Sequence, residues 1–550
     1  MKILQINKMT QNENITPIII EKLNSVKAAK NVELFFEKGE YHFYKEGGLE
    51  QFVAVSNNRS CVRKIIFPII EFDSITINGN GSVFVFHDIT TPFYVYKSKN
   101  IIIKNIIFDR AYSPIINMVV EDKSDKGFKL KIDKSQAPYY VENGNLIFER
   151  EWGELSTADK RLDLLLKKHH NVQFLFAGDS TASTENLPAC YMLTDATEIT
   201  GGVYFTYRKN TQTGCIFDVG AEIYCLADSS MRESDVVVLS DSENIKIENI
   251  TIRRGLSMGI IGQLCNNIEI SGLRTDSDFY KEISTLTADC MHFVNCSGKI
   301  DIHNCDVKCI SDDVINIHGV YTSVKEIDNS GLRVELKHRS QKYFNPYKTG
   351  DLLHIINPAT NEVVSEFVVQ KSEIVSDCGS IIEILGEFLK SSSVIKEGFL
   401  VENPKRMPDV NIFNNNFDKF PCMRVSGAGK IVINDNNLSN CACALQALDL
   451  SEYWMESGRI SNLIFKNNRI SNCVGESVIR VGIAGVNDCN APKIHCRIEI
   501  SDNAFNGINN KAVIAAGVKE LIIENNIFDT EKNDIILIDG EISSKEVCRK

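Results

Sequence analysis

The sequence has 550 residues, of which 43% are hydrophobic and 24% are charged, so it has the composition of an ordinary globular protein and room for two or three domains. Its formal net charge of −12 argues against a nucleic-acid-binding surface and against docking on anionic lipid. No apolar run reaches the length of a membrane span or of a signal peptide, and the 17 cysteines form no CxxC pair of the zinc-binding type, so we interpret them as mostly reduced core residues.

The N-terminal part predicts a cap followed by the first turns of a repeated structure. Residues 17–44 are typical of a short helix followed by a strand, which would cover the open end of a stack. Residues 99–108 (KNIIIKNIIF) then give an early copy of a short pattern. In this pattern two apolar residues at a spacing of two precede a polar turn and a further apolar residue. Alternation with a period of two is typical of strands.

Copies of the pattern recur later in the chain. They lie at 243–252, 266–275, 298–307, 409–417, 430–438, 462–470, 497–505 and 520–528. The shorter steps are close to 22 residues, as in the 23 residues from Ile245 to Ile268, which fits one turn of a three-faced coil. Each unit is too short to bury its own apolar face and must stack on its neighbours. The leucine-dense consensus of a leucine-rich repeat is absent, so the sequence predicts an all-β, right-handed parallel β-helix.

Asparagine marks the same position in several copies. Aligning the copies on their first apolar residue places an asparagine five positions later, at Asn415, Asn436, Asn468, Asn503 and Asn526. Asparagine tolerates turn conformations, and stacked amides can bond to one another along a stack. We therefore expect an asparagine ladder at one corner of the coils.

Two segments interrupt the repeat and predict inserted antiparallel modules resembling β-barrels. Between about 115 and 240, and again between about 321 and 402, hairpin-like stretches such as 127–134, 144–151, 331–338 and 350–369 replace the repeat. The expected organisation is an N-terminal cap with the first coils (1–114), an inserted β module (115–240), coils carrying the catalytic aspartates (241–320), a second inserted module (321–402) and C-terminal coils (403–550).

The segments TADCMHF (287–293) and ISDDVINIHG (310–319) place acidic residues in two neighbouring coils. Asp289 and Asp312 are 23 residues apart, about one coil, and adjacent coils lie about 4.8 Å apart, so we expect Asp289, Asp312 and Asp313 to cluster. Neighbouring strand residues point to opposite faces, so the Asp-Asp pair needs a bend or bulge to face one side. His292 and His318 follow the acidic positions, and Gln263 lies in the coil below.

Three close carboxylates repel one another, so one should stay protonated near neutral pH. A protonated acid beside an ionised base is the equipment for cleaving a glycosidic bond. Taken singly, each aspartate is better explained as a turn residue, and each histidine is equally well explained as a hydrogen-bonded surface residue. A metal site of two histidines and two aspartates is the other interpretation of the group.

The same stretches resemble a known family. TADCMHF and CISDDVINIHG are similar to the acidic coil pairs of pectin-hydrolase β-helices, and more closely to glycoside hydrolase family 110, the α-1,3-galactosidases. Residues 79–114, 293–321 and 448–470 also resemble that family, so the similarity covers most of the β-helical portion. The resemblance implies a β-helix with two inserted β-barrels and an inverting, metal-free hydrolase that removes terminal α-1,3-linked galactose.

The resemblance also implies roles for single residues. Asp312 would be the general acid, with Asp289 and Asp313 as candidate bases. Sugar contacts would come from Asp449, Trp454 and Glu456. The face of an indole suits the apolar side of galactose, so from its chemistry we expect Trp454 to be a stacking platform. The expected substrate-binding set is His292, His318, Gln263, Arg424, Asp449, Trp454 and Glu456.

The sequence departs from the family pattern at two places. Cys290 follows Asp289 where glycine is usual, and we expect its side chain to narrow the groove. Arg110 follows Asp109 where an aromatic residue is frequent. Both departures bear on the choice of substrate, fucosylated or linear, more than on the chemistry.

Other functions stay open at this stage. A polysaccharide lyase or a polygalacturonase-like hydrolase could use the same fold, but a lyase would need a calcium site or a basic residue beside a uronate, and the Asp-Asp coils carry only Lys299 and Lys308. A glycan-binding adhesin or tailspike would need no acid cluster. We expect a carbohydrate partner, no cofactor, no metal, no nucleic acid and no membrane, and leave a homo-oligomer open. The expected compartment is the cytoplasm, or the exterior after removal of a leader.

Overall fold

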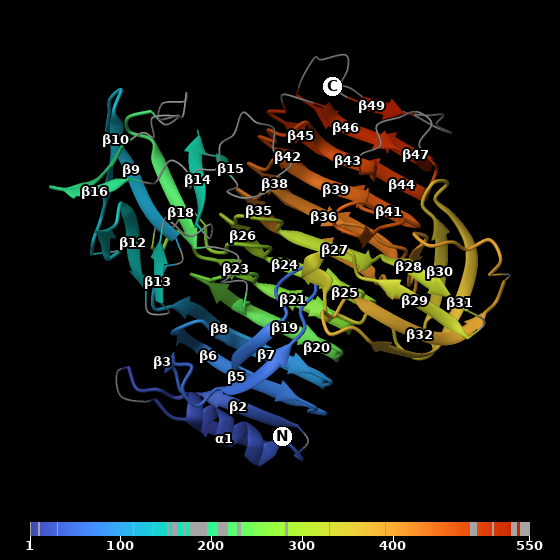
Figure 1. Cartoon of the computed structure of the whole chain (residues 1–550), viewed down its shortest axis with the longest axis horizontal. Helices are drawn as coiled ribbons and strands as arrows, with labels where there is room; N and C mark the ends of the chain where they lie inside the picture. The colour runs from blue at the N-terminus through green and yellow to red at the C-terminus, as the bar shows by residue number, and fades with distance from the viewer. Residues whose placement is uncertain are drawn as a thin grey trace.

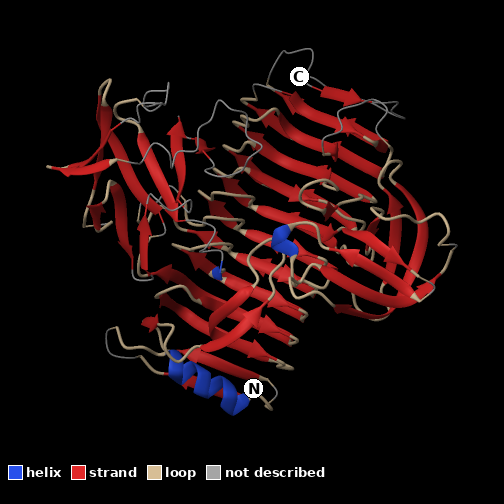
Figure 2. Cartoon of the chain, viewed as in Figure 1, coloured by secondary structure: helices blue, strands red, loops and turns tan. Residues whose placement is uncertain are grey.

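The computed structural model describes residues 2–8, 12–29, 31–113, 115–135, 137–150, 153–156, 162–168, 171–175, 195–206, 218–227, 233–280, 284–328, 330–390, 392–484, 492–508, 511–529 and 536–539. Among the residues described, strands dominate the fold, and one longer helix lies near the N-terminus (Figure 2). The coils stack from the N-terminal end to the C-terminal end of the molecule (Figure 1). The predicted right-handed parallel β-helix is confirmed.

Three rows of parallel strands run along the stack. The first row comprises β2 (Val32–Phe36), β6 (Ile75–Phe86), β8 (Lys99–Arg110), β20 (Glu243–Ile252), β22 (Asn266–Ser271), β25 (Ser297–His303), β34 (Asp409–Phe413), β37 (Lys430–Asn434), β41 (Asn462–Lys466), β44 (His495–Ser501) and β47 (Val518–Glu524). The second row comprises β3 (Glu40–Phe43), the C-terminal halves of β6, β8 and β20, and then β23 (Arg274–Thr275), β26 (Asp306–Lys308), β35 (Asn416–Asp418), β38 (Asn437–Ser439), β42 (Arg469–Ser471), β45 (Ala504–Asn506) and β48 (Ile527–Phe528).

The third row carries the acidic motifs. It comprises β5 (Cys61–Ile70), β7 (Thr91–Tyr96), β19 (Val237–Ser240), β21 (Ile260–Gln263), β24 (Met291–Val294), β27 (Ile315–Val320), β36 (Cys422–Val425), β39 (Cys443–Asp449), β43 (Ser477–Ile483), β46 (Lys511–Ala516) and β49 (Ile536–Asp539). At its N-terminal end β4 (Leu49–Val53) pairs antiparallel with β5, so this row begins with a hairpin.

The N-terminal helix covers the first coils. Helix α1 (Thr16–Val26) buries Ile19, Leu23 and Val26 in the same core as β2 and β3, while β1 (Lys2–Ile6) pairs parallel with β2. Pro17 suits the first turn of the helix because the missing N–H needs no intrahelical partner there. The predicted short helix followed by a strand is confirmed, since the helix ends at Val26 and both β2 and β3 follow it before residue 44.

Apolar side chains of the three rows fill the interior of the coils. The alternation in β20, where Ile245, Ile247, Ile250 and Ile252 are buried, repeats in the later copies of the pattern. These residues and their counterparts form one continuous cluster from the N-terminal cap to the last coils. Stacking therefore supplies the core that a single repeat cannot form.

The asparagine ladder is confirmed. Each side-chain amide donates to the side-chain oxygen of the next asparagine at 2.9–3.1 Å, in the order Asn415, Asn436, Asn468, Asn503 and Asn526. The left-handed backbone turn falls one residue earlier than the ladder positions, at Asn414, Asp435, Asn467, Asp502 and Asn525, whose φ values are 53–58°. The two polar residues of each copy therefore have separate tasks: the first makes the turn and the second bonds along the stack.

Both insertions leave the stacking of the coils intact. β8 and β20 flank the first insertion and pair directly, and β25 and β34 do so around the second. The insertions project from the two sides of the stack in Figure 1, the first on the left and the second on the right.

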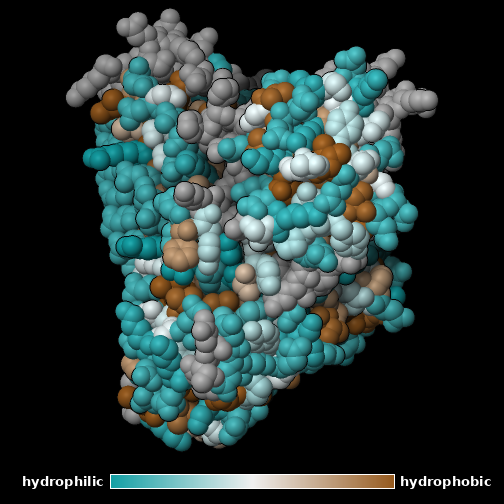
Figure 3. Space-filling view, turned by 90° about the vertical axis from the view of Figure 1, so that its left-hand side faces the viewer, coloured by the Kyte–Doolittle hydropathy of each residue, from teal (hydrophilic) through white to brown (hydrophobic). Residues whose placement is uncertain are grey.

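Hydrophilic side chains cover most of the face shown in Figure 3, where the hydrophobic side chains gather only in small groups.

The two insertions differ in topology. The first forms a seven-stranded antiparallel sheet and a three-stranded sheet, from β9 (Ile115–Lys123), β10 (Gly127–Ile132), β14 (Leu162–Lys168), β15 (Asn171–Leu175), β16 (Ala196–Ile199), β17 (Gly202–Thr206), β18 (Glu222–Ala227), and from β11 (Tyr139–Glu142), β12 (Asn145–Arg150), β13 (Gly153–Ser156). The second is a closed barrel of β28 (Thr322–Ile327), β29 (Gly331–Glu335), β30 (Leu352–Asn357), β31 (Glu362–Ile374), β32 (Ile381–Phe388) and β33 (Leu400–Glu402).

Within the parts of the chain described above, no helix combines the length and the apolar character needed to cross a lipid bilayer. The cysteines whose state the structure gives are free thiols, and most of them are buried, as the sequence predicts.

Candidate active site

The acidic motifs lie at the start of two adjacent strands in the third row. Asp289 precedes β24, and Asp312 and Asp313 precede β27, which pairs with β24 in register Met291↔Ile315. The backbone N–H of Cys290 donates to the carbonyl of Asp313 at 2.9 Å. Asp313, rather than Asp312, is therefore the counterpart of Asp289, and the expected alignment of Asp289 with Asp312 is one residue off.

The expected carboxylate cluster is present. One carboxylate oxygen from each of Asp289, Asp312 and Asp313 lies within 4.8 Å of the other two. Asp289 and Asp313 are buried, and Asp312 is partly exposed. The chain bends between β26 and β27, where Cys309 has φ 55° and the N–H of Asp313 donates to Oδ1 of Asp312 at 3.0 Å. The bend required to bring both aspartates to one site is thus confirmed.

Arg424 brings a positive charge to the cluster. It lies on β36, the next strand of the row, and its Nε is 2.9 Å from Oδ2 of Asp313. Burial raises the pKa of Asp313, the Arg424 guanidinium opposes that rise, and the neighbouring charges of Asp289 and Asp312 add to it. A carboxylate with a raised pKa that still has a cationic partner suits a general base working near neutral pH.

His318 has a defined protonation pattern. Its Nδ1 lies 2.6 Å from the carbonyl oxygen of Gly319, which can only accept, so Nδ1 carries a proton. Burial lowers the pKa of His318, which favours a neutral ring whose Nε2 accepts. Nε2 of His292 lies 3.0 Å from this Nε2 and must therefore donate to it.

The second nitrogen of His292 reaches the cluster. Its Nδ1 lies 2.5 Å from Oδ2 of Asp289. Nε2 of His292 already carries a proton, so a hydrogen bond between its Nδ1 and Asp289 needs a second proton. That proton lies either on Nδ1, which gives an imidazolium and a carboxylate, or on Asp289, which gives a neutral ring and a carboxylic acid. In both forms the pair is neutral overall, which reduces the repulsion among the three carboxylates.

Glu456 lies beside the histidine pair. It forms β40 (Glu456–Ser457), which pairs antiparallel with the end of β27. Its Oε1 lies 3.5 Å from Nε2 of His318 and 2.6 Å from Nδ2 of Asn57, which donates to it. Asn57 belongs to the loop between β4 and β5, and no pattern in the sequence marks it, because it is 399 residues from Glu456 and in no repeat.

Gln263 has a supporting role. Its amide oxygen accepts from the N–H of Ser56 at 3.0 Å, and its amide nitrogen donates to the carbonyl of Ala54 and to Oγ of Ser240. The side chain therefore holds the β4–β5 loop, and its hydrogen-bonding groups are engaged. This placement does not favour the expected direct contact with a sugar.

Asp449 is also a supporting residue. It has no exposed surface, and its Oδ1 accepts from the hydroxyl of Tyr321 and from the N–H of Gly458. Burial, together with the charge of Glu402, raises the pKa of Asp449 to about 7. The side chain anchors residues 450–458, so the expected sugar contact of Asp449 is not favoured by its position.

Trp454 is an exposed aromatic residue of the segment that Asp449 anchors, beside Tyr453, which is exposed as well. It is 44% exposed, with its ring 5.1 Å from that of Tyr453 and 4.9 Å from that of His338, a residue of the second insertion. Its carbonyl accepts from Nε2 of Gln341. An exposed indole held in this way can offer its face to a sugar, so the predicted stacking role of Trp454 stays a prediction.

The two departures from the family pattern are structural. Cys290 is fully buried among the apolar residues of the coil interior, so the expectation that it narrows the groove is wrong. Arg110 is buried as well and donates to the carbonyl oxygens of Asp88 and Thr90. Strand alternation explains the first case, because Cys290 and Asp289 point to opposite sides.

Comparisons with known proteins agree with these features. No family model matches the chain. It is 25% identical over 530 residues to α-1,3-galactosidase B of Bacteroides thetaiotaomicron, covering 93% of this chain and 83% of the relative. It is 26% identical over 543 residues to α-1,3-galactosidase A of Shewanella woodyi, covering 94% and 84%. These relatives confirm the resemblance to α-1,3-galactosidases. They support a glycoside hydrolase.

Among solved structures, the chain is similar to a polygalacturonase from Erwinia carotovora, with a TM-score of 0.43, 9% identity, and coverage of 100% of this chain and 96% of the other.

The carboxylate cluster also has to be considered as a metal site. The spacing of the three carboxylates would also let them share a cation, so the expectation of a metal-free reaction stays a prediction.

Proposed function

We propose that the chain is an exo-acting glycoside hydrolase that releases terminal α-1,3-linked galactose with inversion. The observation that carries the proposal is the cluster of Asp289, Asp312 and Asp313, with its carboxylate oxygens within 4.8 Å. The names of the relatives add the sugar and the linkage.

The roles follow from the partners of each carboxylate. Asp313 has the Arg424 guanidinium beside it, and Asp289 has His292, whose imidazolium form stabilises the Asp289 carboxylate. In that form both carboxylates suit the role of bases that hold and deprotonate a water molecule. Asp312, which is partly exposed, protonates the oxygen of the leaving group. Trp454 and Glu456 serve as sugar contacts.

Exo action is supported by the segments beside the cluster. The β4–β5 loop and the segment that contains Glu456 come from distant parts of the chain and meet at the hydrogen bond between Asn57 and Glu456. A site bounded in this way suits the end of a glycan better than its middle.

Inversion rests on the pair of bases and on the resemblance. The separation of the carboxylates alone does not favour inversion. The two catalytic carboxyl groups are typically about 6.5–9.5 Å apart in inverting enzymes and about 5–5.5 Å apart in retaining enzymes. A retaining mechanism needs only one carboxylate as the nucleophile, whereas an inverting mechanism benefits from two carboxylates that hold the attacking water molecule. Proton NMR of a fresh reaction, recorded before mutarotation, should show β-galactose first. If α-galactose appears first, one of Asp289 and Asp313 is a nucleophile.

The substrate is tested with defined oligosaccharides. We expect galactose release from α-1,3-linked galactosides, fucosylated or linear, and little from α-1,4- or α-1,6-linked ones. Polygalacturonate serves as the test of a polygalacturonase-like activity. Cleavage of polygalacturonate without galactose release would replace the proposal.

A further inference from the structure

The loop between β4 and β5, residues 54–60, which we call the hairpin tip, reaches far along the third row. β5 pairs with β7, and β19, β21 and β24 separate β7 from β27, the strand of His318. The tip nevertheless contacts Gln263 on β21 and Asn57 contacts Glu456, whose strand pairs with the end of β27. The hairpin tip therefore lies across several coils and reaches His318, which contacts His292, the partner of Asp289.

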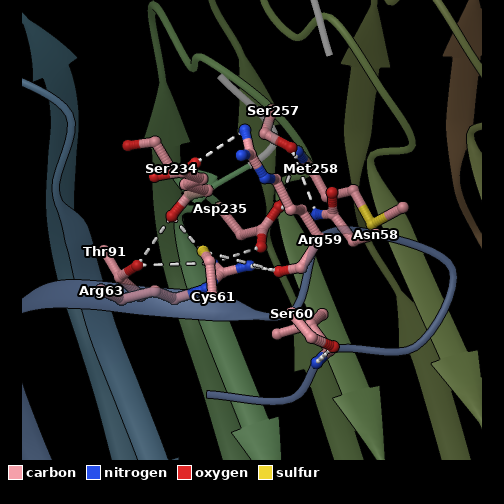
Figure 4. A network of polar contacts seen from close by, with 12 residues as sticks. Asn58, Arg59, Ser60, Cys61, Arg63, Thr91, Ser234, Asp235, Ser257 and Met258 are labelled. Atoms are coloured by element: carbon pink, nitrogen blue, oxygen red, sulfur yellow. Dashed lines mark hydrogen bonds and ion pairs between the residues drawn. The ribbon is translucent and has the colours of Figure 1, made fainter. Parts of the chain in front are cut away.

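A buried ion pair fixes the base of the hairpin tip. Nη1 of Arg63 lies 2.9 Å from Oδ2 of Asp235, and neither side chain is exposed (Figure 4). Nη2 of Arg63 also donates to the carbonyl of Arg59. Oδ1 of Asp235 accepts from Nδ2 of Asn58 at 2.6 Å and from the N–H of Met258. Breaking a buried pair leaves an uncompensated charge, so this network holds the tip in one position.

The far end of the tip is fixed as well. The amide of Gln263 bonds to the backbone at Ser56 and Ala54, and Oγ of Ser56 donates to Oδ1 of Asn57. Since Oδ1 of Asn57 accepts, Nδ2 is directed to Glu456 as the donor, 2.6 Å from Oε1. Nδ2 is also 3.4 Å from Nε2 of His318. Asn57, Glu456 and His318 are all buried.

We propose that the hairpin tip is a fixed wall of the active site and that Asn57 is a positioning residue, which orients the carboxylate of Glu456 for sugar binding. This inference rests on the proposed function. A neutral amide can hold a carboxylate without cancelling its charge, so Glu456 keeps its capacity to accept a sugar hydroxyl. Asn57 is also linked to Asp289, because it lies beside His318, His318 contacts His292, and His292 contacts Asp289.

The decisive variant is Asn57→Gly. Asn57 has φ 58°, so glycine removes the amide and keeps the left-handed backbone accessible, which alanine would not. Asn143→Gly is the matched control, since Asn143 has φ 51° and lies exposed in the turn between β11 and β12. A hydrogen bond to a charged group is typically worth a factor of about ten or more, so we expect Asn57→Gly to raise KM about 10-fold and Asn143→Gly to leave it unchanged.

Two combinations separate positioning from a general structural effect. If Asn57 acts through Glu456, the double variant Asn57→Gly/Glu456→Gln should lose no more kcat/KM than Glu456→Gln alone, whereas independent effects would multiply. Asn57→Asp should be worse than Asn57→Gly, because it places two carboxylates together. Adding Glu456→Gln to Asn57→Asp restores an amide–carboxylate pair and should recover part of the loss.

The outcomes distinguish the two proposals. An active wild type with Asn57→Gly within twofold of it, or with multiplicative losses in the double variant, would remove the role of Asn57 and leave the proposed function in place. A wild type that hydrolyses none of the glycosides would remove the proposed function and this role together. Melting curves of all variants show that the losses do not come from unfolding.

Discussion

Replacing Arg424 with methionine tests how the charge beside Asp313 sets the pH dependence of the reaction. Arg424 stabilises the ionised form of Asp313 at a contact of 2.9 Å, so its removal should raise the pKa of Asp313 beyond the rise that burial already causes. The base must be ionised to act, and the acid limb of kcat/KM reports its pKa in the free enzyme. The acid limb should therefore move to higher pH.

The size of the shift follows from the contact. Unit charges about 4 Å apart interact with about 4 kcal/mol at an effective dielectric constant of about 20, which corresponds to about 3 pKa units. The side chain of Arg424 is 31% exposed, so solvent screens part of this interaction. Arginine next to aspartate typically shifts its pKa by about 1–3 units, and we expect the acid limb to move up by about 1–2 units.

The assay is the pH profile of kcat/KM on an α-1,3-linked galactoside, measured for Arg424→Met, Arg424→Lys and a control. Lysine keeps the charge and should move the limb less. Arg480 is the matched control, because it lies in the same row of side chains: Arg424 pairs in register with Gln446, and Gln446 with Arg480. Arg480→Met should leave the profile unchanged. An acid limb that stays in place in Arg424→Met would exclude Asp313 as the base.

Three other predictions concern the acid, the metal and the ladder. Asp312→Asn should lower turnover of the natural substrate by about 10²–10⁴, and less for an aryl galactoside with a good leaving group; equal losses on both would exclude Asp312 as the acid. Activity should survive dialysis against EDTA, and a loss that Ca²⁺ restores would mean that the three carboxylates hold a cation. Asn436→Ala should destabilise the fold by about 3 kcal/mol because it orphans the buried N–H of Asn415, while the exposed neighbour Asn437→Ala should cost under about 0.5 kcal/mol; equal melting temperatures in calorimetry would contradict this.

The features that repeat along the chain could be predicted from the amino-acid sequence alone. Asn436 and Asn468 lie in copies of one pattern, so aligning the copies predicts their contact without any knowledge of the fold. Asp289 and Asp313 could be brought together in the same way, because stacking places neighbouring copies side by side. The offset was one residue in error, since backbone pairing and the bend before β27, and not the sequence spacing, set the register.

The contacts that join unrelated segments could not be predicted from the sequence and are known only from the folded structure. Asn57 lies in no repeat, and its contact with Glu456 depends on the length and path of the β4–β5 hairpin. Gln263 and Asp449 were both expected to contact the sugar, yet Gln263 holds the β4–β5 loop, and Asp449 is fully buried and anchors residues 450–458. Periodicity of the sequence determines which residues are neighbours within a stack, whereas the partner of a polar side chain depends on which distant segment covers it.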